Sequence, residues 1–360
     1  MRLLFGSFLN YNEIGYIVGR KWTMTILKNV EPDVDIVVTW VDDNDIEWRE
    51  TRDRFKNSEN DSEAQSDLRF RDWDLLRYWF RGIANYAPWV RRVYLVTVNP
   101  VPKWLNLDNG KVVVVHHEDF IPREYLPTYN SRVIELNLHR IEGLSENFVY
   151  FNDDYFLCKP TKKSHFFKGD LPRAMAVLNS LSVGDNISHA MLNNIQLLNE
   201  NFSKHHVLRE SPLKWFNLKY GISMLQNLAL LPWPRFTGFH NHHLPLALKR
   251  SVAEEIWNRE FDALDRTSRS RFRQFTDVNP FLISWWSICS GKFAPAHLKK
   301  YGRYFQLDQV GVAPVVESIR KQKYSTICIN DGSVPDLDAA KHEIQSAFES
   351  ILSEPCRFER

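Results

Sequence analysis

The 360-residue sequence contains few cysteines and no CxxC pair. The four cysteines (Cys158, Cys289, Cys328 and Cys356) lie far apart in the chain, which argues against a disulfide framework and favours a reducing cytoplasm. A dominant charge of one sign is also missing, because 46 Lys and Arg residues nearly balance 44 Asp and Glu residues. The resulting net charge of +2 speaks against a nucleic-acid partner.

Long hydrophobic runs and several common motifs are absent as well. The first residues, MRLLFGSFLNYNEIGYIVGRKW, are apolar only in patches, so they lack the core of a signal peptide and the roughly 20-residue length of a membrane span. We expect residues 1–30 to pack as an ordinary segment or to rest near a membrane surface. The sequence has no GxGxxG, no GxxxxGK[ST] and no GxSxG, so dinucleotide binding, P-loop chemistry and serine hydrolysis lose their usual support.

The chain does contain continuous apolar runs that alternate with segments of helical periodicity. Strands are predicted within 34–45, 91–99, 111–119 and 147–154, with helices within 71–89 and 130–141. Strands that are apolar throughout and separated by helices predict an α/β fold. We therefore expect a mainly parallel, Rossmann-like sheet with helices on both faces, while the polar segment 57–67 is predicted to be a loop.

The second half of the sequence is less regular. Further helices are predicted at 188–202, 211–231, 248–258, 280–289 and 337–352, and one more strand at 324–331. We expect an α/β core over 31–160, a largely helical insertion over 161–240, and a C-terminal part over 241–360.

Four of the predicted strands end in polar or charged groups. These groups are Asp42–Asp43, Thr97 with Asn99, His116–His117 and Asn152–Asp154. In open α/β sheets, ligands bind beyond the carboxyl ends of the strands. The sequence therefore predicts an active site at this rim of the sheet.

The adjacent acids in YFNDDYFL are the first candidates for chemistry. Asn152, Asp153 and Asp154 could hold Mg²⁺ or Mn²⁺ against a diphosphate, since hard cations take oxygen ligands. The alternative is a turn with solvated acids, because paired Asp residues are common in turns. Asp42 and Asp43 could form a second acidic element, although taken alone they favour a turn.

Two further clusters have both a chemical and a plain interpretation. His240, His242 and His243 lack a nearby cysteine and an HExxH motif, so zinc is not expected, but one imidazole could act as a general base. The alternative is a set of exposed loop histidines. Arg271 and Arg273 could clamp phosphate, since guanidinium matches phosphate oxygens, or could simply end a solvated helix.

Several stretches together resemble the Stealth family of sugar-1-phosphate transferases. The stretches are DIVVTWVDDND, RFRDWDLLRYWFRGIANYAPWVRRVYLVT, VVHHEDFIP, LPTYNSRVIELNLHRIEGLSENFVYFNDDYFL, HNHHLPLALKRSVAEEIW with RFRQFTD, and ICINDG. The family includes bacterial capsule and cell-wall enzymes, and the catalytic part of the animal N-acetylglucosamine-1-phosphotransferase is similar. Its four sequence blocks correspond here to 34–45, about 67–160, HNHHLPLALKRSVAEEIW with RFRQFTD, and 327–332. The resemblance implies that 31–160 is the catalytic core, that the insertion 161–240 lies on the acceptor side, and that 241–360 completes the active site.

The resemblance implies roles for particular residues. It implies Asp153, Asp154, His243 and Arg273 as catalytic residues, with His243 on the HxP pattern of the third block. It implies Asn152, Asp154, Asn330 and Asp331 as metal ligands for Mg²⁺ or Mn²⁺. It implies Thr39, Trp40, Val41, Asp42, Arg77 and Asn130 as substrate contacts. The VDD at 41–43 departs from relatives that carry Gly or Asn-Gly after the valine, which puts nucleotide contacts there in doubt.

The implied reaction moves a hexose-1-phosphate, expected to be N-acetylhexosamine-1-phosphate, from a UDP-sugar to a glycan hydroxyl in capsule or surface polysaccharide synthesis. UMP leaves. One alternative is an ordinary metal-dependent glycosyltransferase that releases UDP, and another is an inactive carbohydrate-binding homologue. We expect a cytoplasmic enzyme, with peripheral contact to the inner membrane or capsule machinery and no nucleic-acid partner.

Overall fold

The computed structural model describes residues 31–56 and 71–360, and the described residues from Pro32 onward belong to one compact unit. The predicted N-terminal segment 1–30 and the predicted loop 57–67 lie outside the described residues. The division of the remainder into the three regions predicted above stays a prediction. Within the described ranges, no helix combines the length and apolar character needed to cross a bilayer.

The central sheet has five strands in the order β3-β2-β1-β4-β8. Its parallel strands are β1 (Val34–Thr39), β2 (Val93–Val96), β3 (Val112–Val115) and β4 (Asn147–Asn152). The fifth strand, β8 (Leu246–Lys249), pairs antiparallel with β4 and was not predicted. The helix expected from about Leu248 is α9 (Arg250–Arg259) and begins only after this strand. The prediction of a mainly parallel sheet is confirmed.

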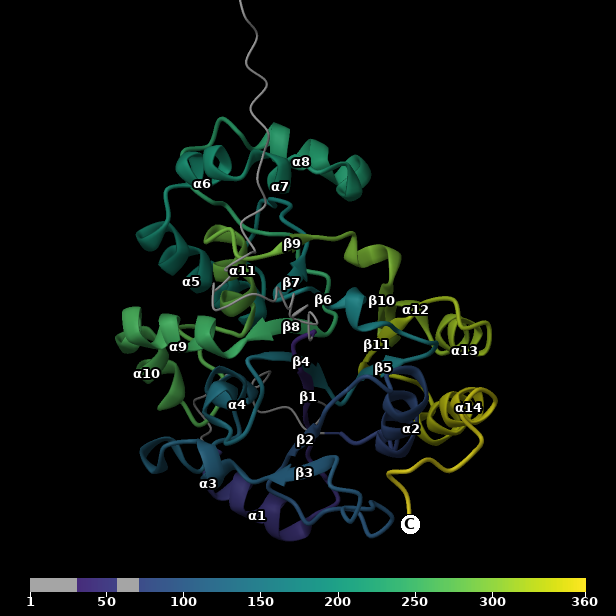
Figure 1. Cartoon of the computed structure of the whole chain (residues 1–360). Helices are drawn as coiled ribbons and strands as arrows, with labels where there is room; N and C mark the ends of the chain where they lie inside the picture. Colours follow the sequence, from purple (N-terminus) through teal and green to yellow (C-terminus); the bar gives the residue numbers. More distant parts are fainter. Residues whose placement is uncertain (1–30, 57–70) are drawn as a thin grey trace, which may run out of the picture. The chain divides into compact units, whose positions relative to one another are not determined.

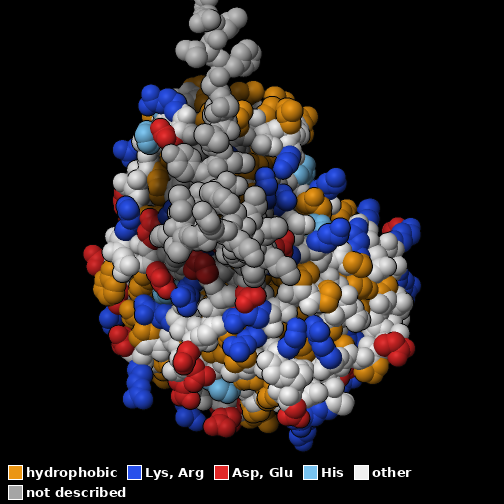
Figure 2. Space-filling model, viewed as in Figure 1, with side chains coloured by type: hydrophobic (Ala, Val, Ile, Leu, Met, Phe, Trp, Pro, Cys, Tyr) orange, Lys and Arg blue, Asp and Glu red, His pale blue; other side chains and the backbone are white. Residues whose placement is uncertain are grey.

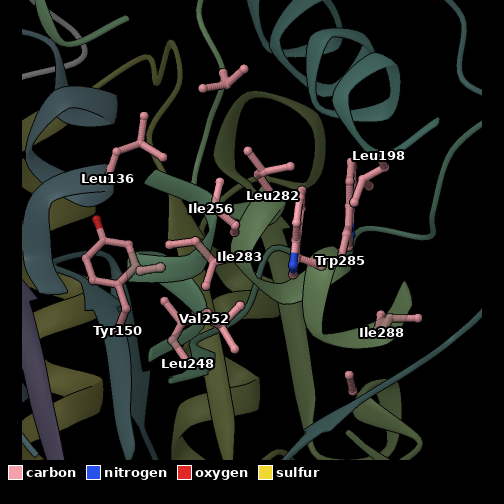
Figure 3. Close-up of a cluster of buried hydrophobic side chains, with 14 of the residues drawn as sticks. Leu136, Tyr150, Leu198, Leu248, Val252, Ile256, Leu282, Ile283, Trp285 and Ile288 are labelled. Atoms are coloured by element: carbon pink, nitrogen blue, oxygen red, sulfur yellow. The ribbon is translucent and has the colours of Figure 1, made fainter. Parts of the chain in front are cut away.

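Successive side chains of β1 enter two different cores, as the alternation of a strand requires. Ile36 and Val38 belong to a core that includes α2 (Leu76–Tyr86), α13 (Ala313–Arg320) and α14 (Leu337–Glu349). Val37 belongs to a core that includes α4 (Ser131–Asn137), α9 and α11 (Phe281–Cys289). Figure 1 shows α9 and α2 on opposite sides of the central strands, and Figure 3 shows Val252 and Ile256 close to Ile283 within the second core. Helices therefore cover both faces, as predicted.

Two smaller sheets complete the strands of the described chain. One has the order β10-β11-β5, with β10 (Gly302–Gln306), β11 (Thr326–Asn330) and β5 (Tyr155–Leu157). The other contains β6 (Phe167–Lys168), β7 (Leu171–Ala174) and β9 (Ala294–Pro295). The predicted strand at 324–331 is confirmed as β11. β11 lies outside the central sheet, between β10 and β5, because β5 turns away from the central sheet directly after β4.

The helical part of the second half is more broken than predicted. The remaining helices are α1 (Ile46–Arg54), α3 (His117–Phe120), α5 (Asn186–Asn201), α6 (Lys204–Glu210), α7 (Pro212–Trp215), α8 (Met224–Ala229), α10 (Phe261–Ser268) and α12 (Leu307–Val310). The single helix expected over 211–231 is divided into α7, the 3-10 helix η5 (Leu218–Ser223) and α8. Gly221 has φ +56°, a conformation that glycine adopts without steric cost and that interrupts the helix.

Two buried histidines make the stability of this fold depend on pH. Burial lowers the pKa of both His117 and His139 from 6.5 to about 4. The unfolded chain therefore binds more protons between pH 6.5 and 4, and stability falls as the pH drops through this range. From pH 7 to pH 4.5 we expect each histidine to remove about 2–3 kcal/mol from the free energy of unfolding.

Urea unfolding of the wild type and of His139→Gln at both pH values measures this effect. The variant is expected to lose less stability on acidification than the wild type, by the amount given for one histidine. Equal losses in the two proteins would show that His139 takes up no proton on unfolding in this range.

Candidate active site

The adjacent acids occupy the turn that joins the central sheet to the smaller sheet. Asp153 and Asp154 lie between the end of β4 and the start of β5. The backbone N–H of Ile329 donates to the carbonyl oxygen of Asp154 at 2.9 Å, so β11 is held against the same turn. The polar end of β11, Asn330, therefore arrives beside the acid pair although more than 170 residues separate them in the chain. The turn interpretation of the acids and their grouping at a site are thus compatible.

His243 reaches the acid turn because β8 runs antiparallel to β4. Leu246 pairs with Tyr150, so the loop before β8 lies at the end of β4. His243 has φ +45°, and its backbone N–H donates to Asn241 Oδ1 at 2.9 Å. Its ring packs edge-on against the rings of Tyr155 and Tyr304, with centroids 5.8 and 5.0 Å away. The loop and these rings together fix the imidazole.

Arg273 lies on a loop that a buried polar network ties to α4. The buried carboxylate of Asp277 accepts hydrogen bonds from Asn130 Nδ2 at 2.9 Å and Arg132 Nη1 at 3.2 Å. Arg273 Nη2 then donates to Ser131 Oγ at 2.7 Å. The guanidinium is therefore not a solvated helix end, because it is anchored beside the first residue of α4.

These elements enclose a cavity of about 440 Å³. The predicted site residues that line it are Trp40, Asn152, Asp153, Asp154, His243, Arg273, Asn330 and Asp331. They come from the end of β1, the β4–β5 turn, the loop before β8, the loop after α10 and the end of β11. The structure thus brings the predicted acids, imidazole, guanidinium and amides to one cavity.

The titrating groups of this cavity have strongly shifted pKa values. Burial raises the pKa of Asp154 to about 7. Burial, and next the charge of Asp154, raise the pKa of Asp153 well above its usual range. Burial, and next the charge of Arg273, lower the pKa of His243 to about 4. The imidazole is therefore neutral at pH 7 and free to accept a proton. The raised pKa values of the two acids mean that added positive charge in the cavity would stabilise their ionised forms.

The residues at the acid turn fit a divalent cation. Donor atoms of Asp154, His243 and Cys328 lie within 4.8 Å of one another, the one such grouping of three found in the described ranges. Cys328 Sγ donates to Asp154 Oδ2 at 3.2 Å, and burial raises the pKa of the thiol well above its usual range. The other oxygen, Asp154 Oδ1, is buried and has no hydrogen-bond partner among residues 31–56 and 71–360. An unpartnered buried carboxylate oxygen is costly, and a cation would satisfy it.

The thiol bears on which cation fits. Zinc is selected by thiolate ligands, and the Cys328 thiol here donates a hydrogen bond to Asp154. The cavity is also lined by the oxygen-bearing side chains of Asn152, Asn330 and Asp331, which are of the type that Mg²⁺ and Mn²⁺ prefer. The other two histidines of the loop stack on each other with centroids 4.7 Å apart, and His240 lies 3.0 Å from Lys299 Nζ, so the three do not form a zinc cluster.

The predicted substrate contacts are distributed over several places. Thr39 and Val41 line an adjoining cavity of about 160 Å³ that shares Trp40, Asp153 and Arg273 with the first. A further cavity of about 540 Å³ is lined by Asp42 and Arg77, among others. Asn130 is fully buried and lines none of these three cavities. Asn130 donates hydrogen bonds to Ser270 and Asp277 and so helps to position the loop that carries Arg273. Its buried position gives no support to direct contact with the substrate.

Sequence reasoning missed several polar side chains that line the cavity of about 440 Å³, among them Arg71, Asp72, Glu135 and Tyr150. Arg71 Nη1 lies 3.4 Å from Asp331 Oδ1, and burial raises the pKa of Asp72 to about 6. The Tyr150 hydroxyl lies within hydrogen-bond distance of Glu135 and Asn152. The one available signal was a charged Glu135 inside the apolar run VIELNL, which the helical periodicity left unexplained.

Comparison with known proteins gives a consistent set of matches. Models of three conserved regions of Stealth proteins match the chain: region 1 over residues 32–59, region 2 over 69–174 and region 3 over 242–288. The predicted fourth block at 327–332 stays a prediction.

Similar proteins align over nearly their full length. The capsular polysaccharide phosphotransferase WcwK of Streptococcus pneumoniae is 37% identical over 93% of this chain and 100% of its own. The exopolysaccharide phosphotransferase cps2G of Lactiplantibacillus plantarum is 39% identical over 91% of this chain and 96% of its own. The receptor polysaccharide phosphotransferase WefC of Streptococcus gordonii is 36% identical over 91% and 98%.

Proposed function

The chain belongs to the Stealth family, and we propose that it is a phosphotransferase of polysaccharide synthesis that moves a sugar-1-phosphate from a UDP-sugar to a glycan hydroxyl. The observation that carries this proposal is the shared cavity, in which two acids, a neutral imidazole and an anchored guanidinium meet. Phosphoryl transfer needs positioning and charge stabilisation more than covalent chemistry, and these groups supply both.

The transfer can be written with each group in one role. The acceptor hydroxyl oxygen attacks the β-phosphorus, a new P–O bond forms, and the bond from that phosphorus to the bridging oxygen breaks so that UMP leaves. His243 takes the proton of the hydroxyl, which its neutral state at pH 7 allows. Arg273 stabilises the charge on the transferred phosphoryl oxygens. Asp153 lies beside Asp154 and lines the same cavity, where it would orient the acceptor.

A divalent cation is part of the proposal. Asp154 would hold it through the unpartnered Oδ1, with Asn152, Asn330 and Asp331 as further oxygen donors. When bound, Mg²⁺ or Mn²⁺ would supply positive charge that neutralises the diphosphate oxygens. Cys328 fixes Asp154 through the opposite oxygen, so the carboxylate presents one oxygen and not both.

The nucleotide would extend into the adjoining cavity that contains Thr39, Trp40 and Val41. This cavity is also lined by Trp48 and Tyr129, and aromatic rings of this kind provide a stacking surface for a base.

We further infer a cytoplasmic site of action. It is supported by four cysteines that are all free thiols.

The donor and the reaction type can be tested together. The purified full chain is incubated with Mg²⁺, a panel of UDP-hexoses and UDP-N-acetylhexosamines, and an oligosaccharide acceptor. We expect phosphorus NMR to show a sugar–phosphodiester–sugar signal, and the released nucleotide to be UMP. The reason is that the phosphoryl group remains attached to the sugar throughout the transfer.

The same experiment separates the alternatives. Release of UDP without a phosphodiester product would identify an ordinary glycosyltransferase. Tight binding of UDP-sugars with no turnover on any acceptor would indicate a carbohydrate-binding homologue. Either result would contradict the proposed function.

A further inference from the structure

Six large apolar side chains are exposed on the segment that runs from α7 through η5 and α8 to the loop after it. They are between 46% and 87% exposed, and we call them the apolar surface: Leu213, Leu218, Ile222, Leu225, Leu228 and Trp233. Nearly half of the large hydrophobic side chains that are exposed in the described chain fall on this one segment. Concentrated apolar exposure of this kind marks a binding surface, whereas scattered exposed residues do not.

The inner side of the same segment is firmly fixed, so its exposure is not the fraying of a loose loop. The buried side chain of Asn227 donates to the carbonyl oxygens of Ala176 and Trp215 at 2.8 and 2.7 Å and accepts from the N–H of Leu178 at 2.7 Å. The buried Lys204 donates to carbonyl oxygens of the chain that follows α8, including that of Leu231 at 3.3 Å. Fully buried Trp215 stacks on Phe236 from the same side. The backbone is therefore held in a way that presents the apolar surface outward.

The charge of the segment that carries the apolar surface is mostly positive. Residues 203–235 contain five Lys and Arg residues, of which Lys204 is buried, against the single acid Glu210. Arg209, Lys219 and Arg235 are exposed. Figure 2 shows hydrophobic side chains gathered at the upper end of the molecule, where Figure 1 places α7 and α8, with Lys and Arg side chains nearby.

We propose that this apolar surface docks the protein on a lipid bilayer that contains anionic lipids. Helices that bind at a membrane surface insert apolar side chains to the depth of the headgroups and place basic residues against anionic lipids. Trp233 has the side chain that is most typical of that boundary. A bilayer satisfies both the apolar groups and the excess of positive charge. This inference does not depend on the proposed reaction.

Vesicle sedimentation tests the proposal with the full chain. Vesicles of equal parts phosphatidylglycerol and phosphatidylcholine are compared with vesicles of phosphatidylcholine alone. We expect the wild type to bind the anionic vesicles more strongly, and binding to weaken as salt is raised. In the double variant Leu218→Glu with Ile222→Glu, we expect the partition coefficient to fall by at least about tenfold, since removing one buried Leu or Ile side chain already corresponds to about that factor.

The matched control is Phe261→Glu with Val310→Glu, which adds the same charge at two exposed apolar positions outside the segment. It should bind vesicles like the wild type. Both double variants should keep the wild-type circular dichroism spectrum and the wild-type rate on a water-soluble acceptor. The proposal is overturned if the wild type does not bind anionic vesicles, or if the two double variants bind equally well. It is also overturned if sedimentation velocity shows a dimer that the Leu218 and Ile222 changes dissociate, with no lipid binding.

Discussion

Asp154→Asn is expected to lower kcat for sugar-phosphate transfer by about 10²–10⁴-fold, because the side chain would lose the charge that holds a cation and aligns the diphosphate. Stability should move in the opposite direction. The Asp154 carboxyl is buried, its pKa is raised to about 7, and Oδ1 has no partner in the described chain. Replacing it with a neutral amide of similar shape removes an unfavourable buried charge, so the melting temperature should stay the same or rise.

The measurement is steady-state transfer with Mg²⁺ together with thermal unfolding in the absence of metal. Asp108→Asn is the control, since Asp108 is exposed and does not line the cavity, and it should leave both quantities as in the wild type. A rate near that of the wild type in Asp154→Asn would falsify the role assigned to Asp154. Wild-type activity that persists after exhaustive treatment with EDTA would count against the cation in particular.

His243→Ala is expected to lower kcat by about 10²–10⁴-fold while leaving the binding of the UDP-sugar nearly unchanged. The reason is that the imidazole is neutral and lies beside the acids, where it can take the acceptor proton, but it makes no contact that the structure assigns to the nucleotide. Binding is measured by calorimetry with the UDP-sugar and turnover by UMP release.

His240→Ala serves as the matched control for this effect. His240 lies on the same loop but does not line the cavity of about 440 Å³ that His243 lines. Its substitution should affect turnover little. If His240→Ala and His243→Ala reduce turnover equally, the loop as a whole matters and His243 is not the base. If His243→Ala abolishes UDP-sugar binding, the imidazole holds the donor instead.

The parallel strands could be predicted because each is defined by its own residues. β1 and β4 are mostly apolar runs, and such runs are typical of strands that are buried on both faces of a parallel sheet. β8 could not be predicted, since its four residues, LALK, carry no β-branched side chain and become a strand only by pairing with β4. The break at Gly221 was missed for a related reason, because a helical pattern says little about where φ changes sign.

The candidate site, like the fold, could be predicted only in part. Asp153 and Asp154, the loop histidines, and Arg271 and Arg273 were candidates on chemistry alone, and the family resemblance singled out His243 and Arg273. Glu135 and Asp72 were not among the candidates, because each lies in a segment predicted to be helical. Only the closure of α4 and the β4–β5 turn around one cavity reveals them as its lining.

The sequence by itself determined the class of fold, the alternation of strands and helices, and the acids that end β4, because these follow from local periodicity and side-chain chemistry. The tertiary structure decided that β4 leads into a second sheet, that β8 carries His243 to the end of β4, and that the ring of Tyr155 and the thiol of Cys328 shape the acid turn. The physical reason is that pairing between distant segments depends on which surfaces are buried together. That free energy belongs to the assembled chain and is not contained in any one stretch of it.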